Sequence, residues 1–90
     1  MFNYKFIVLV CQEVYIEFMY NQDVILKQFG LNVKAERIRK GLTQEQFAEK
    51  IGVERVYISK IERGLQNMSL KKIIELTNHL NADIKNILNF

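Results

Sequence analysis

The sequence predicts an all-helical fold, and three observations lead to this class. The chain of 90 residues has no proline and no tryptophan, and its four glycines lie between residues 30 and 64. From residue 23 onward, apolar residues recur at helical spacing between capping residues and glycines. The joints between these segments are short, which leaves no room for a sheet in the last two-thirds of the chain.

Five helices are predicted from these signals. Thr43 and Gln46 have the spacing of a capping box, which begins the second helix. Glycines end the first three helices, while Asn67 or Ser69 can cap the fourth and Asp83 the fifth. The predicted ranges are 23–40, 44–51, 54–63, 70–80 and 84–90.

Residues 1–22 differ from the rest and are treated as an N-terminal extension to a domain of residues 23–90. They are rich in aromatic and β-branched residues, which favours a β-strand. Apolar residues also recur there every four residues, so a helix is an alternative. The segment is either a real extension that adds a strand or a dimer contact, or a leader that precedes a true start at Met19.

Composition limits the class of protein further. Residues 31–67 carry eight Lys or Arg and five Asp or Glu, whereas residues 1–30 carry two and three, so the positive excess lies in the middle. This distribution fits a polyanionic partner. One cysteine, Cys11, cannot form an internal disulfide, and no Cys/His cluster has metal-ligand spacing, so we expect a cytoplasmic protein without metal or cofactor. The apolar run 6–11 is too short to span a membrane.

The most informative stretch is LTQEQFAEKIGVERVYISKIERG, residues 42–64. Two short helices that meet at a sharp turn need a small residue at their contact and a residue that tolerates positive φ, which Ala48 and Gly52 supply. Apolar residues stand at helical spacing on the inner faces: Phe47, Ile51, Val53, Ile58 and Ile61. The spacing alone fits an ordinary helical hairpin as well as a DNA-binding helix-turn-helix. It leaves four residues on the outer face of the second helix: Arg55, Val56, Ser59 and Lys60.

From residue 29 to residue 88 the chain resembles the Xre family of phage-repressor and Cro-like helix-turn-helix regulators. The similar elements are VKAERIRKGLTQEQFAEKIG, YISKIERG and SLKKIIELTNHLNADIKNIL. The run ERVYISKIERG and the residues after it are most similar to controller proteins of restriction–modification systems. The resemblance implies a five-helix, repressor-like DNA-binding domain.

The resemblance also implies roles for individual residues. Arg55 and Lys60 match base-reading positions, with Val56 and Ser59 beside them. Arginine can bond to guanine O6 and N7, and valine can contact a thymine methyl group. Gln44 matches a residue that contacts a phosphate and braces the recognition helix. The other expected contacts to the DNA backbone are Tyr57, Arg63, Gln66 and Asn67.

Arg37 and Glu62 match an Arg–Glu pair that ties the first helix to the end of the recognition helix. A partly buried ion pair of this kind argues for fixed geometry more than for net stability. Two positions depart from the family pattern. Glu54 replaces the usual Ser or Thr cap and brings an anion near the DNA, and Met68 replaces the usual proline before the fourth helix.

A homodimer is expected, because one helix-turn-helix reads only a few base pairs and two copies must lie about 34 Å apart to match one turn of the duplex. The last helix carries more apolar side chains than a small core can bury from one side. Leu80 and Ile84 are expected to face inward. The residues expected at the dimer interface are Ile87, Leu88 and Phe90.

The sequence therefore predicts a sequence-specific transcriptional regulator that binds duplex DNA as a homodimer, of the restriction–modification controller kind. The alternative is an antitoxin-type interaction module of the same fold that binds a toxin. No paired carboxylates, nucleophile–base pair or phosphate loop suggests an enzyme. No membrane association or small-molecule ligand is expected.

Overall fold

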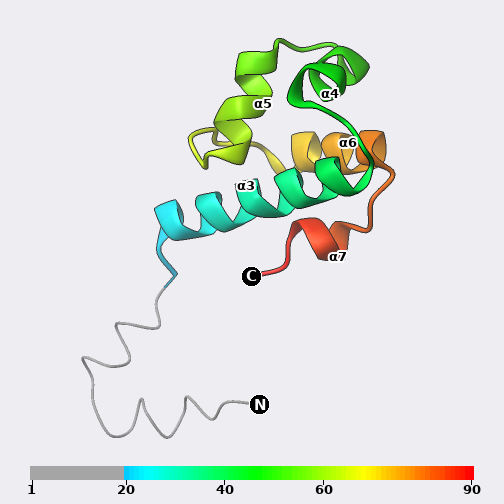
Figure 1. Ribbon diagram of the computed structural model, residues 1–90. Helices are drawn as coiled ribbons and strands as arrows, with labels where there is room; N and C mark the ends of the chain where they lie inside the picture. The colour runs from blue at the N-terminus through cyan, green and yellow to red at the C-terminus, as the bar shows by residue number, and fades with distance from the viewer. Residues whose placement is uncertain (1–19) are drawn as a thin grey trace, which may run out of the picture.

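A computed structural model describes residues 20–90, and within this range the regular elements are all helices (Figure 1). The predicted all-helical class and the five helices are confirmed. The strand considered for the N-terminal extension, and the alternative start at Met19, lie outside the described residues. The helices are α3 (Gln22–Arg39), α4 (Gln44–Ile51), α5 (Arg55–Glu62), α6 (Leu70–Leu80) and α7 (Ile84–Ile87).

The helix boundaries follow from local capping chemistry. Thr43 Oγ1 accepts a hydrogen bond from the Gln46 N–H at 3.0 Å, and the Gln46 side chain accepts one from the Thr43 N–H at 2.9 Å. This capping box begins α4, and Gly52 ends it in the left-handed conformation with φ of 77°. The caps of α6 and α7 are Ser69 and Asp83, whose side chains each accept a backbone N–H.

The core lies where all five helices meet. In Figure 1, α3 passes between the α4–α5 pair and α7. α6 packs against α4 and α7, so it closes the remaining side. Burying these apolar side chains is the main stabilising contribution in so small a domain. The buried apolar residues are Phe29, Val33, Phe47, Ala48, Ile58, Ile61, Leu76, Leu80 and Ile87.

The backbones of α3 and α5 approach unusually closely at Gly30. A Cβ atom on Gly30 would lie 2.4 Å from the carbonyl oxygen of Ile61 and 2.6 Å from that of Glu62. Gly64 repeats this just beyond α5, since a Cβ there would lie 2.8 Å from the Cα of Lys27. Gly30 and Gly64 therefore allow the close packing of α5 against α3 and set the distance between the two helices.

The last helix is shorter than predicted, and this corrects the assignment of Ile87. α7 ends at Ile87 instead of continuing to residue 90. Ile87 is fully buried in the core of the monomer, so the expectation that it lies at the dimer interface is wrong. Ile84, which was expected to face inward, is 36% exposed. The cause lies on α3, where Asn32 Nδ2 donates to the carbonyl oxygens of Ile87 at 3.0 Å and Asn89 at 2.8 Å. These bonds hold the end of the chain against α3 and turn Ile87 inward.

Within residues 20–90, no helix has both the length and the apolar character needed to cross a membrane.

Candidate nucleic-acid interface

α4 and α5 form a helix-turn-helix whose angle is fixed by small and apolar residues. Ala48 is 2% exposed at the contact, and the Val53 N–H donates to its carbonyl oxygen at 2.9 Å across the turn. Phe47 and Ile58 are fully buried, while Ile51, at the end of α4, is only partly buried. The inner face therefore anchors the pair, and the outer face of α5 stays free.

Most of the predicted base-reading residues lie together on that outer face. Arg55, Val56 and Lys60 are exposed, and Ser59 is half-buried. Val56 leaves 49% of its surface open on this face. The face thus combines two cations, a hydroxyl and an apolar group on one rigid helix.

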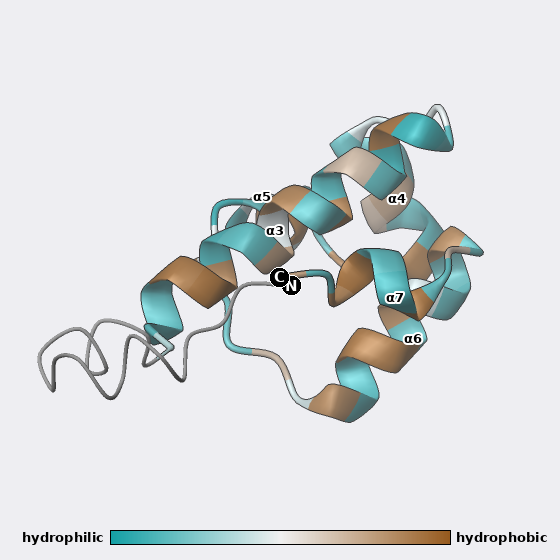
Figure 2. Cartoon of the chain, turned by 90° about the horizontal axis from the view of Figure 1, so that it is seen from below, coloured by the Kyte–Doolittle hydropathy of each residue, from teal (hydrophilic) through white to brown (hydrophobic). Residues whose placement is uncertain are grey.

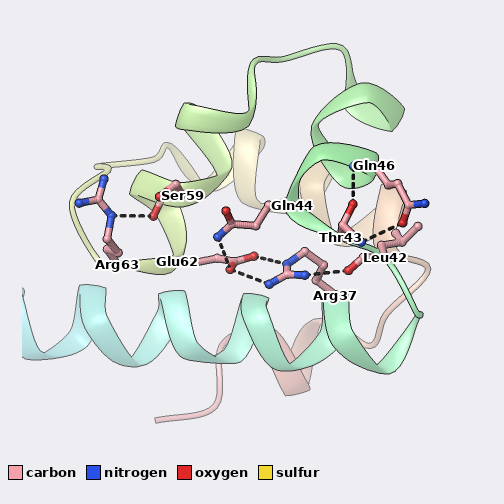
Figure 3. A network of polar contacts seen from close by, with 8 residues as sticks. All are labelled: Arg37, Leu42, Thr43, Gln44, Gln46, Ser59, Glu62 and Arg63. Carbon is pink, nitrogen blue, oxygen red and sulfur yellow. Dashed lines mark hydrogen bonds and ion pairs between the residues drawn. The ribbon is translucent and has the colours of Figure 1, made fainter.

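A buried polar network fixes the position of α5 (Figure 3). Arg37 Nε donates to Glu62 Oε2 at 2.6 Å, and Arg37 Nη2 donates to Glu62 Oε1 at 3.1 Å. Arg37 Nη1 also donates to the carbonyl oxygen of Leu42 at 2.7 Å. The Arg37 and Glu62 side chains are 9% and 3% exposed, so this two-point contact is shielded from water and from salt.

Gln44 completes the network from α4. Its Nε2 donates to Glu62 Oε1 at 3.0 Å, so α3, α4 and α5 are joined through one carboxylate. Because a carboxylate only accepts hydrogen bonds, the amide nitrogen of Gln44 must be the atom that faces Glu62. The second N–H of that amide remains available at the half-buried surface.

The start of α4 adds donors beside Gln44. The Gln46 N–H bonds the Thr43 side chain and the Phe47 N–H bonds the Thr43 carbonyl oxygen. Backbone N–H groups of the first helical turn have no intrahelical acceptor, and those of Gln44 and Glu45 find none elsewhere among the described residues. An open hollow in front of them is bounded by Thr43, Gln44 and Arg55. Gln44, a predicted phosphate contact, and Arg55, a predicted base contact, thus lie at the edge of the same hollow.

The remaining predicted backbone contacts are placed less uniformly. Arg63 is exposed at the end of α5, where its Nε donates to the Ser59 carbonyl oxygen at 3.3 Å. Asn67 is exposed and Gln66 half-buried in the loop that follows. Tyr57 departs from the group, because it is half-buried in a separate hollow that it lines with Ile51, Val53, Met68 and residues of α6.

Two residues with positioning roles were not predicted from the sequence, Gly30 beneath the site and Asn32 beside the end of the chain. Gly30 sets the distance between α5 and α3, and Asn32 holds the C-terminal end of the chain against α3. A signal for Gly30 was present, since a glycine inside a helical pattern usually has a packing reason. No local signal marks Asn32, because its acceptor on Ile87 is 55 residues away.

Comparison with known proteins gives a consistent result. Residues 33–85 match the family model HTH_3, described as helix-turn-helix. The control protein C.BamHI of Bacillus amyloliquefaciens is 38% identical over 63 residues, which cover 69% of this chain and 78% of that protein. The crystal structure of the restriction–modification controller protein C.AhdI from Aeromonas hydrophila matches with a TM-score of 0.63 and 35% identity, over 69% of this chain and 94% of that one.

A third match concerns a complex with DNA. The restriction–modification controller protein C.Esp1396I, solved as a tetramer with its natural operator of 35 base pairs, has a TM-score of 0.60 and 33% identity, over 72% of this chain and 96% of that one.

Proposed function

This chain belongs to the helix-turn-helix family HTH_3, and on that premise we propose that it is a sequence-specific transcriptional regulator that reads duplex DNA with α5. The observation that carries the proposal is the exposed outer face of α5, held in place by the network of Arg37, Gln44 and Glu62. A rigid helix that presents cations and an apolar side chain suits the major groove, which admits one α-helix.

Each side chain on this face has a chemical counterpart on a base edge. Arg55 stands in the first turn of α5, where it can donate two hydrogen bonds to guanine O6 and N7. Val56 can contact the methyl group of a thymine, and Ser59 and Lys60 can donate to base acceptors one turn further along. Arg55 is therefore the residue that we expect to discriminate most strongly between bases.

The contacts to the DNA backbone are proposed for a second group of donors. The free N–H of the Gln44 amide and the backbone N–H groups at the start of α4 suit a phosphate at the helix N-terminus. Arg63 and the loop residues Gln66 and Asn67 would contact phosphate beyond the other end of α5. Tyr57 stays a predicted backbone contact, although it lies half-buried toward α6. Such contacts set the register on the duplex and carry no sequence information.

Relatedness to restriction–modification control proteins narrows the proposal. C.BamHI is a control protein, C.AhdI is a restriction–modification controller protein, and C.Esp1396I was solved as a tetramer on its operator, so we assign this chain a regulatory, non-catalytic role. All three relatives are control or controller proteins by name, so they give no support to the alternative of a toxin-binding module. A regulator acts where its DNA is, so the proposal includes a cytoplasmic location.

The proposed dimer surface is the exposed end of the chain. Phe90 is 57% exposed and Leu88 partly buried, and both line a hollow with Tyr20 and Ile25. Figure 2 shows the chain end beside α7, between α3 and α6, with hydrophobic segments on these helices. Asn32 holds this end in place, so the surface is rigid enough to fix two copies at the spacing of one duplex turn.

Deleting Phe90 and changing Leu88→Asp is expected to convert the dimer into a monomer with the fold kept. The charge would be buried without a partner at the interface, while in the monomer Leu88 already contacts water. Sedimentation at micromolar concentration measures the association and circular dichroism the fold.

The matched control is Ile38→Asp, because Ile38 is also 57% exposed but lies near the other end of α3. If the double variant still forms the dimer, the dimer interface lies elsewhere and the proposed surface is wrong. A dimer lost only when residues 1–18 are deleted would place it in the N-terminal extension.

Arg55→Ala is expected to cost about 1–3 kcal/mol of binding free energy at a selected duplex and less on random duplex. Gln44→Ala should weaken binding to both duplexes by the same factor, since a phosphate contact carries no base information. Fluorescence anisotropy titrations on the two duplexes measure both effects.

Lys85→Ala serves as the control, because it removes one exposed cation from α7, on the side of α3 away from α5 (Figure 1). Equal losses on both duplexes for Arg55→Ala would reassign Arg55 to phosphate contact.

A further inference from the structure

Glu54 occupies the capping position of α5 without acting as a cap. The capping residues of the other described helices, Asn21, Thr43, Ser69 and Asp83, each accept a backbone N–H with their side chains. Glu54 has the extended backbone of a cap, with φ of −81° and ψ of 151°, but its carboxylate accepts no such bond. The side chain is exposed beside Arg55. Its carboxylate oxygens are therefore free to accept other donors.

The carboxylate is also unpaired within the part of the chain that the structure describes. The two ion pairs of residues 20–90 join Arg37 with Glu62 and Arg39 with Glu36. On the proposed binding face, Glu54 would bring a negative charge toward a polyanion, which is unfavourable unless the charge meets a donor on the DNA. The first turn of a recognition helix is the part that contacts base edges, so the donor within its reach is a base amino group.

The chemistry of the major groove limits which base this is. Guanine presents two acceptors and thymine one, and each of these repels a carboxylate. Adenine offers its N6 amino group, but the N7 acceptor stands next to it. Cytosine offers its N4 amino group with no neighbouring acceptor on the same base, and Glu is the residue type that accepts from it. A free carboxylate at this position therefore favours cytosine.

We propose that Glu54 is a specificity residue, which selects a cytosine at the operator position beside the base pair that Arg55 reads. The inference rests on the proposed function, because it requires α5 to lie in the major groove. Two neighbouring residues of opposite charge, Glu54 and Arg55, then read a donor and an acceptor on adjacent base pairs. The carboxylate contributes mainly by rejecting the other bases and adds little affinity.

The test compares the duplex sequences selected from a random pool by the full chain and by variants. The position read by Arg55 is identified first, as the one whose preference disappears in Arg55→Ala. The wild type is expected to favour cytosine at an adjacent position by about 5- to 150-fold, the range for one mismatched base pair. Glu54→Ala should reduce this preference below about twofold and leave the other positions unchanged. Glu54→Gln should admit adenine there, because a Gln amide matches adenine N6 and N7.

Glu49→Ala is the matched control, since it removes an exposed glutamate from α4 and makes the same change in net charge. It should retain the wild-type motif and change only the overall affinity. If Glu54→Ala also retains the wild-type motif, Glu54 acts only through its charge and this inference is overturned while the proposed function stands. If the wild type itself selects no sequence, the proposed function fails and this inference fails with it.

Discussion

Gly30→Ala is expected to destabilise the domain by about 3 kcal/mol or more, although glycine to alanine inside a helix usually stabilises by about 1 kcal/mol. The new Cβ would lie 2.4 Å from the carbonyl oxygen of Ile61 and 2.6 Å from that of Glu62. Both atoms belong to backbone, so the overlap is relieved only by moving α5 away from α3. The same movement would shift the outer face of α5, so DNA affinity should fall as well. Urea unfolding measures the change in stability.

Gly41→Ala is the control that separates this clash from backbone strain. Gly41 has φ of 73°, which disfavours a side chain, but a Cβ there meets nothing within 4 Å. Its cost should be about 1–2 kcal/mol, the penalty of the left-handed conformation. A Gly30→Ala variant that is more stable than the wild type would contradict the close approach of α3 and α5.

Glu62→Ala is expected to cost about 3–5 kcal/mol of unfolding free energy, because it leaves the Arg37 guanidinium buried without its counter-ion. Replacing both partners with apolar residues, Arg37→Met with Glu62→Leu, should cost much less, since no unpaired charge is buried. Urea unfolding again measures both. The double variant should nevertheless bind DNA more weakly, because Gln44 loses the acceptor that orients its amide.

Glu75→Ala, which removes an exposed carboxylate from α6, should change stability by less than about 0.5 kcal/mol. A Glu62→Ala variant as stable as this control would show that the network does not hold α5. A double variant as unstable as Glu62→Ala would show that the loss comes from packing and not from an unpaired charge.

Much of the fold was predictable because its signals are local. The capping box of Thr43 and Gln46, the left-handed Gly52 and the caps of α6 and α7 each depend on residues no more than a few positions apart. These features set where helices begin and end. The spacing of the hydrophobic residues then indicated which faces of α4 and α5 are buried. The outer face of α5 was then predicted as the face that carries none of these buried residues.

The features that the sequence did not reveal depend on distant residues. The length of α7 and the burial of Ile87 depend on Asn32, whose side chain bonds carbonyl oxygens 55 and 57 residues away. The role of Gly30 depends on where α5 crosses α3, and helical periodicity carries no information about crossing points. The Arg37–Glu62 pair was expected only through the family resemblance, because the two residues are 25 positions apart.

The central claim is that two copies of α5 read a two-fold-related operator, and the selection of bound sequences from random duplex DNA tests it most directly. We expect the wild-type chain to enrich a motif with two half-sites related by two-fold symmetry. Their centres should lie about 10–10.5 base pairs apart, which is one turn of the duplex. Within each half-site, the preference lost in Arg55→Ala should be for guanine. A pool that shows no enriched motif after repeated selection would contradict the claim.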